Sequence, residues 1–187
     1  MLFTTTKLNG AYIIEIERKE DERGFFARTY CQREFEAQGI DFNIVQSNVS
    51  YNKKKATLRG LHAQLAPYKE SKLVRCSSGS IYDVIVDMRK NSATYLQWYG
   101  EKLTKDNYKM MYIPEGFAHG FITLEDETEV VYQMSEYYTP GAEIGFRWND
   151  IAFNIEWPLA PEVMSAKDQS YPLYVPTQDY SVAHLFI

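Results

Sequence analysis

The chain has 187 residues, of which 45% are apolar and 24% are charged, and this is enough for one well-filled core but little for two. Its formal net charge of -5 excludes the basic surplus by which nucleic-acid-binding proteins neutralise phosphates. We therefore expect a single domain over residues 1–187 that binds no nucleic acid.

Short strands dominate the predicted elements, in keeping with an aromatic content of 15%. A strand is predicted at 11–18, and a short helix at 31–39 that ends at Gly39. Further strands are predicted at 44–51, 71–76, 80–88, 108–113, 119–124 and 128–138. Many short strands with little helix between them predict a mostly β protein, an antiparallel double-sheet jelly-roll barrel.

The two cysteines and the lack of long apolar runs indicate the cellular compartment of the protein. Cys31 and Cys76 form no Cys-x-x-Cys pair, which argues against a disulfide framework or a thiolate metal site. The first residues lack the apolar core of a signal peptide, and no apolar run approaches the roughly 20 residues that span a bilayer. We expect a soluble protein of a reducing cytoplasm, with no membrane partner.

Two segments carry histidines at positions that resemble the two histidine motifs of cupin barrels. They are "TLRGLHAQ" at 57–64 and "IPEGFAHGF" at 113–121, where a proline and a glycine shape the turn before His119. A metal-binding cupin would place a second histidine where Gln64 stands. His62 and His119 alone make a poor transition-metal site, so we predict no catalytic metal.

His62 has two interpretations on the residues alone. A histidine on a β-strand is often a core residue with its hydrogen bonds satisfied. However, cations recur beside the glycine- and histidine-bearing segments, and a barrel that combines cations with an imidazole suits an anionic ligand. These cations are Arg23, Arg59, Lys72 and Lys167.

Five segments resemble, in order and spacing, the dTDP-4-dehydrorhamnose 3,5-epimerase family. They are "DERGFFARTY" (21–30), "QSNVSYNKKKATLRGLHAQ" (46–64), "KLVRCSSGSIYDVIVDMRKNSATYLQW" (72–98), "YIPEGFAHGF" (112–121) and "MSAKDQSYP" (164–172). The resemblance covers about residues 10–173 and implies a homodimeric isomerase with no cofactor. Such an enzyme inverts carbons 3 and 5 of a nucleotide-linked 4-keto-6-deoxyhexose, dTDP-4-dehydro-6-deoxyglucose, through an enolate.

The resemblance also implies roles for individual residues. His62 would be the general base, Asp168 would orient it, and Tyr132 would return a proton from the opposite face. A proton beside a ketone is a far weaker acid than imidazolium, whose reference pKa is about 6.5, so the enolate must be stabilised, by Lys72 first and His119 second. The remaining implied substrate-binding residues are Arg23, Arg28, Gln46, Asn48, Arg59, Tyr138, Glu143 and Lys167, and of these Tyr138 would stack on the base.

The sequence departs from the family pattern at three places. Arg28 stands where the family usually has Glu near the nucleoside, Ala63 replaces a larger aromatic, and residues from about 174 to 187 extend past the matched region. Because of Arg28, a second hypothesis is an epimerase that acts at one carbon only or on another nucleotide sugar, including a CDP-linked one. A non-catalytic sugar- or nucleotide-binding cupin is a third hypothesis, but a binder needs no acid–base pair.

Overall fold

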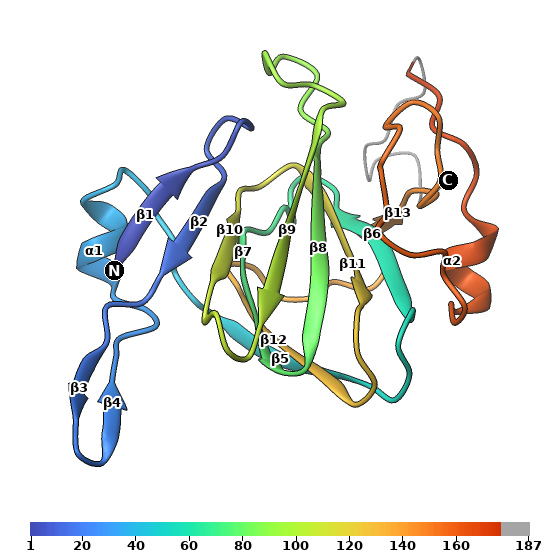
Figure 1. The fold of residues 1–187 in the computed structure, drawn as a ribbon. Coiled ribbons are helices and arrows are strands. Elements are labelled where there is room, and N and C mark those ends of the chain that lie inside the picture. Colours follow the sequence, from blue (N-terminus) through green and yellow to red (C-terminus); the bar gives the residue numbers. More distant parts are fainter. Residues whose placement is uncertain (177–187) are drawn as a thin grey trace.

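Two antiparallel sheets face each other in the computed structural model, which describes residues 1–176 (Figure 1). The six-stranded sheet has the order β1 (Leu2–Thr5), β2 (Tyr12–Glu15), β10 (Met110–Ile113), β7 (Lys72–Ser78), β12 (Thr128–Met134), β5 (Gln46–Asn52). The five-stranded sheet has the order β13 (Glu143–Gly145), β6 (Leu58–Gln64), β11 (Phe117–Thr123), β8 (Ser80–Asp87), β9 (Trp98–Thr104). The predicted double-sheet jelly roll is confirmed.

Strands β2, β5, β7, β8, β10, β11 and β12 and the first helix lie where the sequence predicts them, with ends that differ by a few residues. Helix α1 (Gln32–Glu36) is followed by Gly39 with a φ of 73°, in the left-handed region. The predicted strand ranges include neither β6 nor β9, although each of these strands has seven residues. The short strands β1, β3 (Lys19–Asp21), β4 (Gly24–Phe26) and β13 were missed as well, because three or four residues show too little alternation to be read. The hairpin of β3 and β4 is exposed throughout, and helix α2 (Ala166–Ser170) has a single turn.

The hydrophobic core fills the space between the two sheets. Side chains alternate along each strand, so Ile81 and Ile85 of β8 point into the core, whereas Val84 and Val86 point outward. The outward set is covered by the segment after β13, and Tyr174 packs there. Helix α1 covers the β2, β10 and β7 side of the other sheet with Phe35. The five-stranded sheet is thereby packed on both faces, and the six-stranded sheet is packed on both faces over β2, β10 and β7.

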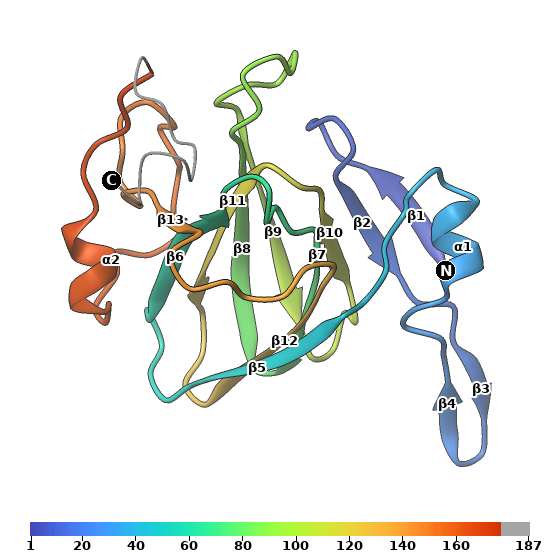
Figure 2. The same ribbon diagram turned by 180° about the vertical axis from the view of Figure 1, so that it is seen from behind.

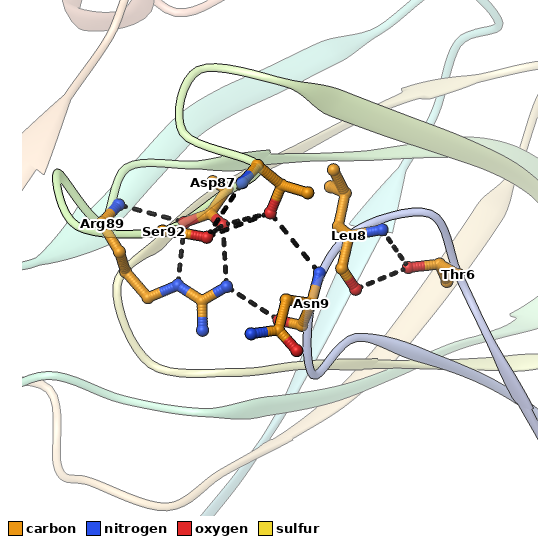
Figure 3. Close-up of polar contacts among 7 residues, drawn as sticks. Thr6, Leu8, Asn9, Asp87, Arg89 and Ser92 are labelled. Atoms are coloured by element: carbon orange, nitrogen blue, oxygen red, sulfur yellow. Dashed lines mark hydrogen bonds and ion pairs between the residues drawn. The ribbon is translucent and has the colours of Figure 1, made fainter.

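Asp87, at the end of β8, joins the loop after this strand to the turn between β1 and β2. Its fully buried carboxylate accepts hydrogen bonds from the Arg89 guanidinium and from the hydroxyls of Ser92 and Thr94. Arg89 in turn donates to the backbone carbonyl of Asn9, 2.7 Å away (Figure 3). Burial would raise the pKa of Asp87, but these donors outweigh it and lower the pKa below its ordinary value.

The substitution Asp87→Asn should lower the free energy of unfolding by about 2–4 kcal/mol at pH 7, because it leaves Arg89 without its counter-charge. Since the pKa of Asp87 is lower in the folded chain than in the unfolded chain, its stabilisation is present at neutral pH. This stabilisation is lost as the pH falls below about 4. Urea unfolding of both proteins against pH measures the difference, with Asp41→Asn at an exposed site as control. A difference that does not shrink in acid would contradict the assignment.

No helix within residues 1–176 is long and apolar enough to cross a membrane. Residues 177–187, which include most of the predicted C-terminal extension, lie outside the described residues.

Candidate active site

A cavity of about 570 Å³ opens between the two sheets, and many of the residues singled out in the sequence line it. The five-stranded sheet contributes Arg59 and His62 from β6, His119 from β11 and Glu143 from β13. The six-stranded sheet contributes Lys72 and Tyr132 from the facing side, and Lys167 and Asp168 reach in from α2. The fold therefore brings together side chains that are more than 100 residues apart in the sequence.

A second cavity of about 370 Å³ adjoins the first and shares four lining residues with it. The shared residues are His62, Lys72, Tyr132 and Glu143. Three further predicted residues line the second cavity but not the first, namely Gln46, Asn48 and Tyr138. The predicted substrate-binding residues of the barrel therefore divide between two joined compartments. A ligand with two unlike halves, such as a nucleotide and a sugar, fits this division.

His62 forms a dyad with Asp168. The imidazole Nε2 lies 2.7 Å from Asp168 Oδ1, and the backbone N–H of Gly60 donates to Oδ2 at 3.3 Å. Burial would raise the pKa of Asp168, but the hydrogen bond and charge of His62 outweigh it and lower the pKa. Asp168 is thus a carboxylate at neutral pH and can only accept, so His62 must carry its proton on Nε2.

Two local features hold this dyad in place. Ser165 caps α2, its hydroxyl accepting from the backbone N–H of Asp168, and this fixes the start of the helix. Gly60 has a φ of 115°, and a Cβ there would lie 2.6 Å from the Cα of Gly120 on β11. The glycine before His62 is therefore needed for the close approach of β6 to β11, which sets His62 opposite His119.

His119 also has a carboxylate partner, Asp83, which the sequence analysis missed. The imidazole Nε2 lies 2.7 Å from Asp83 Oδ1, and Asp83 is fully buried on β8. Within residues 1–176 the second oxygen of Asp83 has no hydrogen-bond partner. The signal was an aspartate in the middle of the apolar strand "SIYDVIVDM", since a buried charge needs a partner.

Lys72 has a similar buried partner. Its ammonium lies 3.0 Å from the carboxylate of Glu70, whose side chain is 4% exposed. Glu70, also missed in the sequence, thereby keeps a charged amine at the cavity wall, where an isolated ammonium would be costly to bury.

Tyr132 lies on β12, in the sheet that faces His62. Burial raises the pKa of its phenol, and the nearby charge of Arg59 opposes this only in part. The phenol is therefore protonated at neutral pH and can act as a proton donor, but not as a base.

The rim of the cavities carries a chain of polar contacts. The Lys167 ammonium lies 2.7 Å from Glu143 Oε2, and the Tyr138 hydroxyl donates to the same oxygen at 3.2 Å. Burial would raise the pKa of Glu143, but Lys167 outweighs it and lowers the pKa. The predicted rim residues are thus coupled to one another before any ligand binds.

Arg23 and Arg28 lie outside both cavities of their own chain. Arg23 is at the tip of the β3–β4 hairpin, which projects from the barrel on the side away from α2 (Figure 1), and it pairs with Asp21 at 2.6 Å. Arg28 pairs with Glu34 at 2.8 Å beside α1. Neither arginine reaches these cavities in its own protomer, so their predicted contacts with substrate stay predictions.

A sequence model described as dTDP-4-dehydrorhamnose 3,5-epimerase matches residues 5–175. The chain is 45% identical to the dTDP-4-dehydrorhamnose 3,5-epimerase of Salmonella typhimurium over 176 residues, which cover 92% of this chain and 95% of the relative. The chain belongs to the dTDP-4-dehydrorhamnose 3,5-epimerase family.

Solved structures agree with this assignment. The epimerase of Bacillus anthracis, with TDP and pyrophosphate bound, superposes with a TM-score of 0.89 at 41% identity, covering 92% of this chain and 99% of that chain. The enzyme of Legionella pneumophila, in complex with dTDP-4-keto-L-rhamnose, superposes with a TM-score of 0.86 at 37% identity, covering 92% of each chain. The family resemblance seen in the sequence is confirmed.

The family also contains an enzyme described as acting at one carbon. The dTDP-4-dehydrorhamnose 3-epimerase of Streptomyces niveus is 33% identical over 173 residues, which cover 92% of this chain and 83% of the relative. Family membership therefore establishes an epimerase, and the names of its members differ in the number of carbons inverted.

We predict that the enzyme keeps full activity in EDTA. Within residues 1–176 no three side chains of the His, Cys, Asp and Glu types are grouped as metal ligands. Gln64 stands where a cupin would have a further histidine, and its amide is engaged with backbone groups. Initial rates before and after chelation test the prediction, and activity that is lost in EDTA and restored by one divalent ion would overturn it.

Proposed function

We propose that this protein is a dTDP-4-dehydrorhamnose 3,5-epimerase that converts dTDP-4-dehydro-6-deoxyglucose to dTDP-4-dehydrorhamnose. One observation carries the mechanism: the predicted base and the predicted acid lie on opposite sheets, with the cavity between them. Inversion of a carbon requires that the proton leave from one face and return to the other. A base and an acid on facing walls meet this requirement without movement of the backbone.

His62 is the base in this proposal. Its Nε2–H donates to Asp168, so Nδ1 holds the lone pair that takes the proton from the carbon beside the ketone. Once protonated, the imidazolium is stabilised by the carboxylate, which lowers the cost of the step. The capped helix α2 and the backbone of Gly60 fix the carboxylate, so the ring is oriented before substrate binds.

Lys72 and His119 stabilise the enolate from two sides of the cavity. Lys72 comes from β7 in one sheet and His119 from β11 in the other. Nε2 of His119 faces Asp83, so Nδ1 is the nitrogen left to donate to the ketone oxygen. Lys72 and His119 thus place hydrogen-bond donors around the position where the negative charge develops.

Tyr132 completes inversion. Its phenol, protonated because burial raises its pKa, gives a proton to the face of the enolate that His62 does not reach. His62 then passes its proton to solvent and the Tyr132 phenolate takes up a proton from solvent, so the pair is ready for the second carbon.

The test is the reaction itself, followed by proton NMR with dTDP-4-dehydro-6-deoxyglucose as substrate. Inversion at carbons 3 and 5 is the expected result, with CDP- and GDP-linked 4-keto sugars turned over more slowly. Inversion at carbon 3 alone would place the protein with the one-carbon enzymes. Binding of dTDP without any inversion or exchange would show a non-catalytic module.

We further propose that the enzyme is a homodimer. On the six-stranded sheet, α1 leaves the outer face of β12 and β5 uncovered, and Val49 and Tyr51 there are 62% and 50% exposed. Figure 2 shows β5 beside β12 along this face. A second copy would cover the exposed apolar side chains and bring a hairpin with Arg23, which its own cavity does not use. Light scattering should give twice the monomer mass, and Val49→Asp should lower it; a monomeric native enzyme would refute the proposal.

A further inference from the structure

Gln64, at the end of β6, is 6% exposed and uses both ends of its amide. The amide nitrogen donates to the backbone carbonyls of Tyr68 at 3.0 Å and Tyr137 at 3.1 Å. The amide oxygen accepts from the backbone N–H of Thr139 at 2.7 Å. A single buried side chain thus joins two loops at the edge of the second cavity.

The two contacts on the 137–139 segment flank Tyr138. The carbonyl before Tyr138 and the N–H after it both bond to Gln64, while the N–H of Tyr138 itself donates to Gln46 Oε1 at 3.1 Å. Two glutamines therefore fix three successive residues of a segment that forms no regular strand. The Tyr138 side chain remains 52% exposed at the cavity. A rigid backbone that presents an exposed aromatic ring is suited to stacking on a flat ligand.

We propose that Gln64 is a positioning residue for the nucleotide, acting through Tyr138: it holds the 137–139 backbone so that the ring of Tyr138 is placed to stack on the base. The inference rests on the proposed function, which gives the substrate a nucleoside. Gln64 contacts neither the sugar nor the reacting carbons in this role, so it acts on binding and not on proton transfer.

The amide is the group that this position needs. It must donate to a carbonyl and accept from an N–H at the same time, which glutamine does and an ionised glutamate cannot. Methionine matches glutamine in length but offers neither contact, so Gln64→Met removes the hydrogen bonds with little change of volume. The freed segment would then have to be ordered when the ligand binds, which weakens binding.

The test is calorimetric titration of the full-length enzyme with dTDP, together with steady-state kinetics. Loss of base–aromatic stacking costs about 1–3 kcal/mol, or about 5- to 150-fold in affinity, and we expect Gln64→Met to weaken dTDP binding by about tenfold. KM should rise with the Kd, while kcat should change by less than about twofold. Gln38→Met, at an exposed position, is the matched control and should leave all three constants unchanged.

A double-mutant cycle separates positioning from a general loss of structure. If Gln64 acts through Tyr138, then Gln64→Met should weaken dTDP binding by less than about twofold in a Tyr138→Ala background. Equal losses in both backgrounds, or a native-like Kd for Gln64→Met, would overturn the proposal. A native enzyme that does not bind dTDP would instead refute the proposed nucleotide, so the two failures are distinguishable.

Discussion

The substitution His62→Asn is expected to abolish deuterium exchange at both carbons 3 and 5 of a 4-keto sugar nucleotide in heavy water. In the proposed mechanism Nδ1 of His62 removes the proton, and asparagine has no basic nitrogen. Loss of a general base costs roughly 100- to 10,000-fold, so exchange should fall by at least that factor. Proton NMR of the sugar signals follows exchange and inversion in one experiment.

The control for His62→Asn is the fold. His62 is a partly exposed residue, with 32% of its side chain accessible, so removal of its ring should change the melting temperature little. Binding of dTDP should also persist, since Tyr138, the residue predicted to stack on the base, lines the second cavity and not the first. Exchange at the native rate in a folded His62→Asn enzyme would show that the histidine is only a core residue.

The sequence predicts the site best where a motif and its local turn lie together. "TLRGLHAQ" contains His62 and also Gly60, whose lack of a Cβ allows β6 to approach β11. The alternation of side chains along a strand then predicts that His62 faces inward. Asp168 was assigned through the family resemblance, because no local rule links residues separated by 106 positions, and the structure places it 2.7 Å from His62.

The buried carboxylate partners of His119 and Lys72 could not be predicted in the same way. Asp83 meets His119 because β8 and β11 are neighbours in the five-stranded sheet, and sheet order is a property of the whole fold. Glu70 lies two residues before Lys72, the first residue of β7, and no clear sequence signal pairs the two side chains. The positions of Arg23 and Arg28 depend on a hairpin of exposed three-residue strands, whose direction the residue pattern does not encode.

The placement of the proposed acid, Tyr132, and the proposed base, His62, on different sheets also follows from the order of the strands. Tyr132 and His62 are both inward residues of strands, which the pattern predicts, but inward residues can share a sheet or face each other. Tyr132 lies on β12, between β7 and β5 in the six-stranded sheet. The two histidines lie on the neighbouring strands β6 and β11 of the five-stranded sheet, which faces it. In the proposed mechanism that arrangement separates proton removal from proton return, and we expect the two steps to be separable by mutation.

The substitution Tyr132→Phe is expected to separate these steps, because it removes the phenolic proton and keeps the ring. His62 and Asp168 remain intact, so proton abstraction at the first carbon should continue and wash deuterium into the recovered starting sugar. Inversion should fall by at least roughly 100-fold, the lower limit for loss of a general acid. The same NMR experiment in heavy water distinguishes deuterium in the starting sugar from deuterium in the epimer.

The alternative role for Tyr132 is a core aromatic that packs on the inter-sheet cluster. Phenylalanine would then serve equally well, and Tyr132→Phe would invert at the native rate. A second variant, Tyr99→Phe, is the matched control, since Tyr99 packs on the same cluster but is not a lining residue of either cavity. We expect Tyr99→Phe to invert at the native rate, and Tyr132→Phe to exchange deuterium without inversion. This pair of results would assign the second proton to Tyr132, because only the loss of a donor on the far face leaves the base active while no product forms.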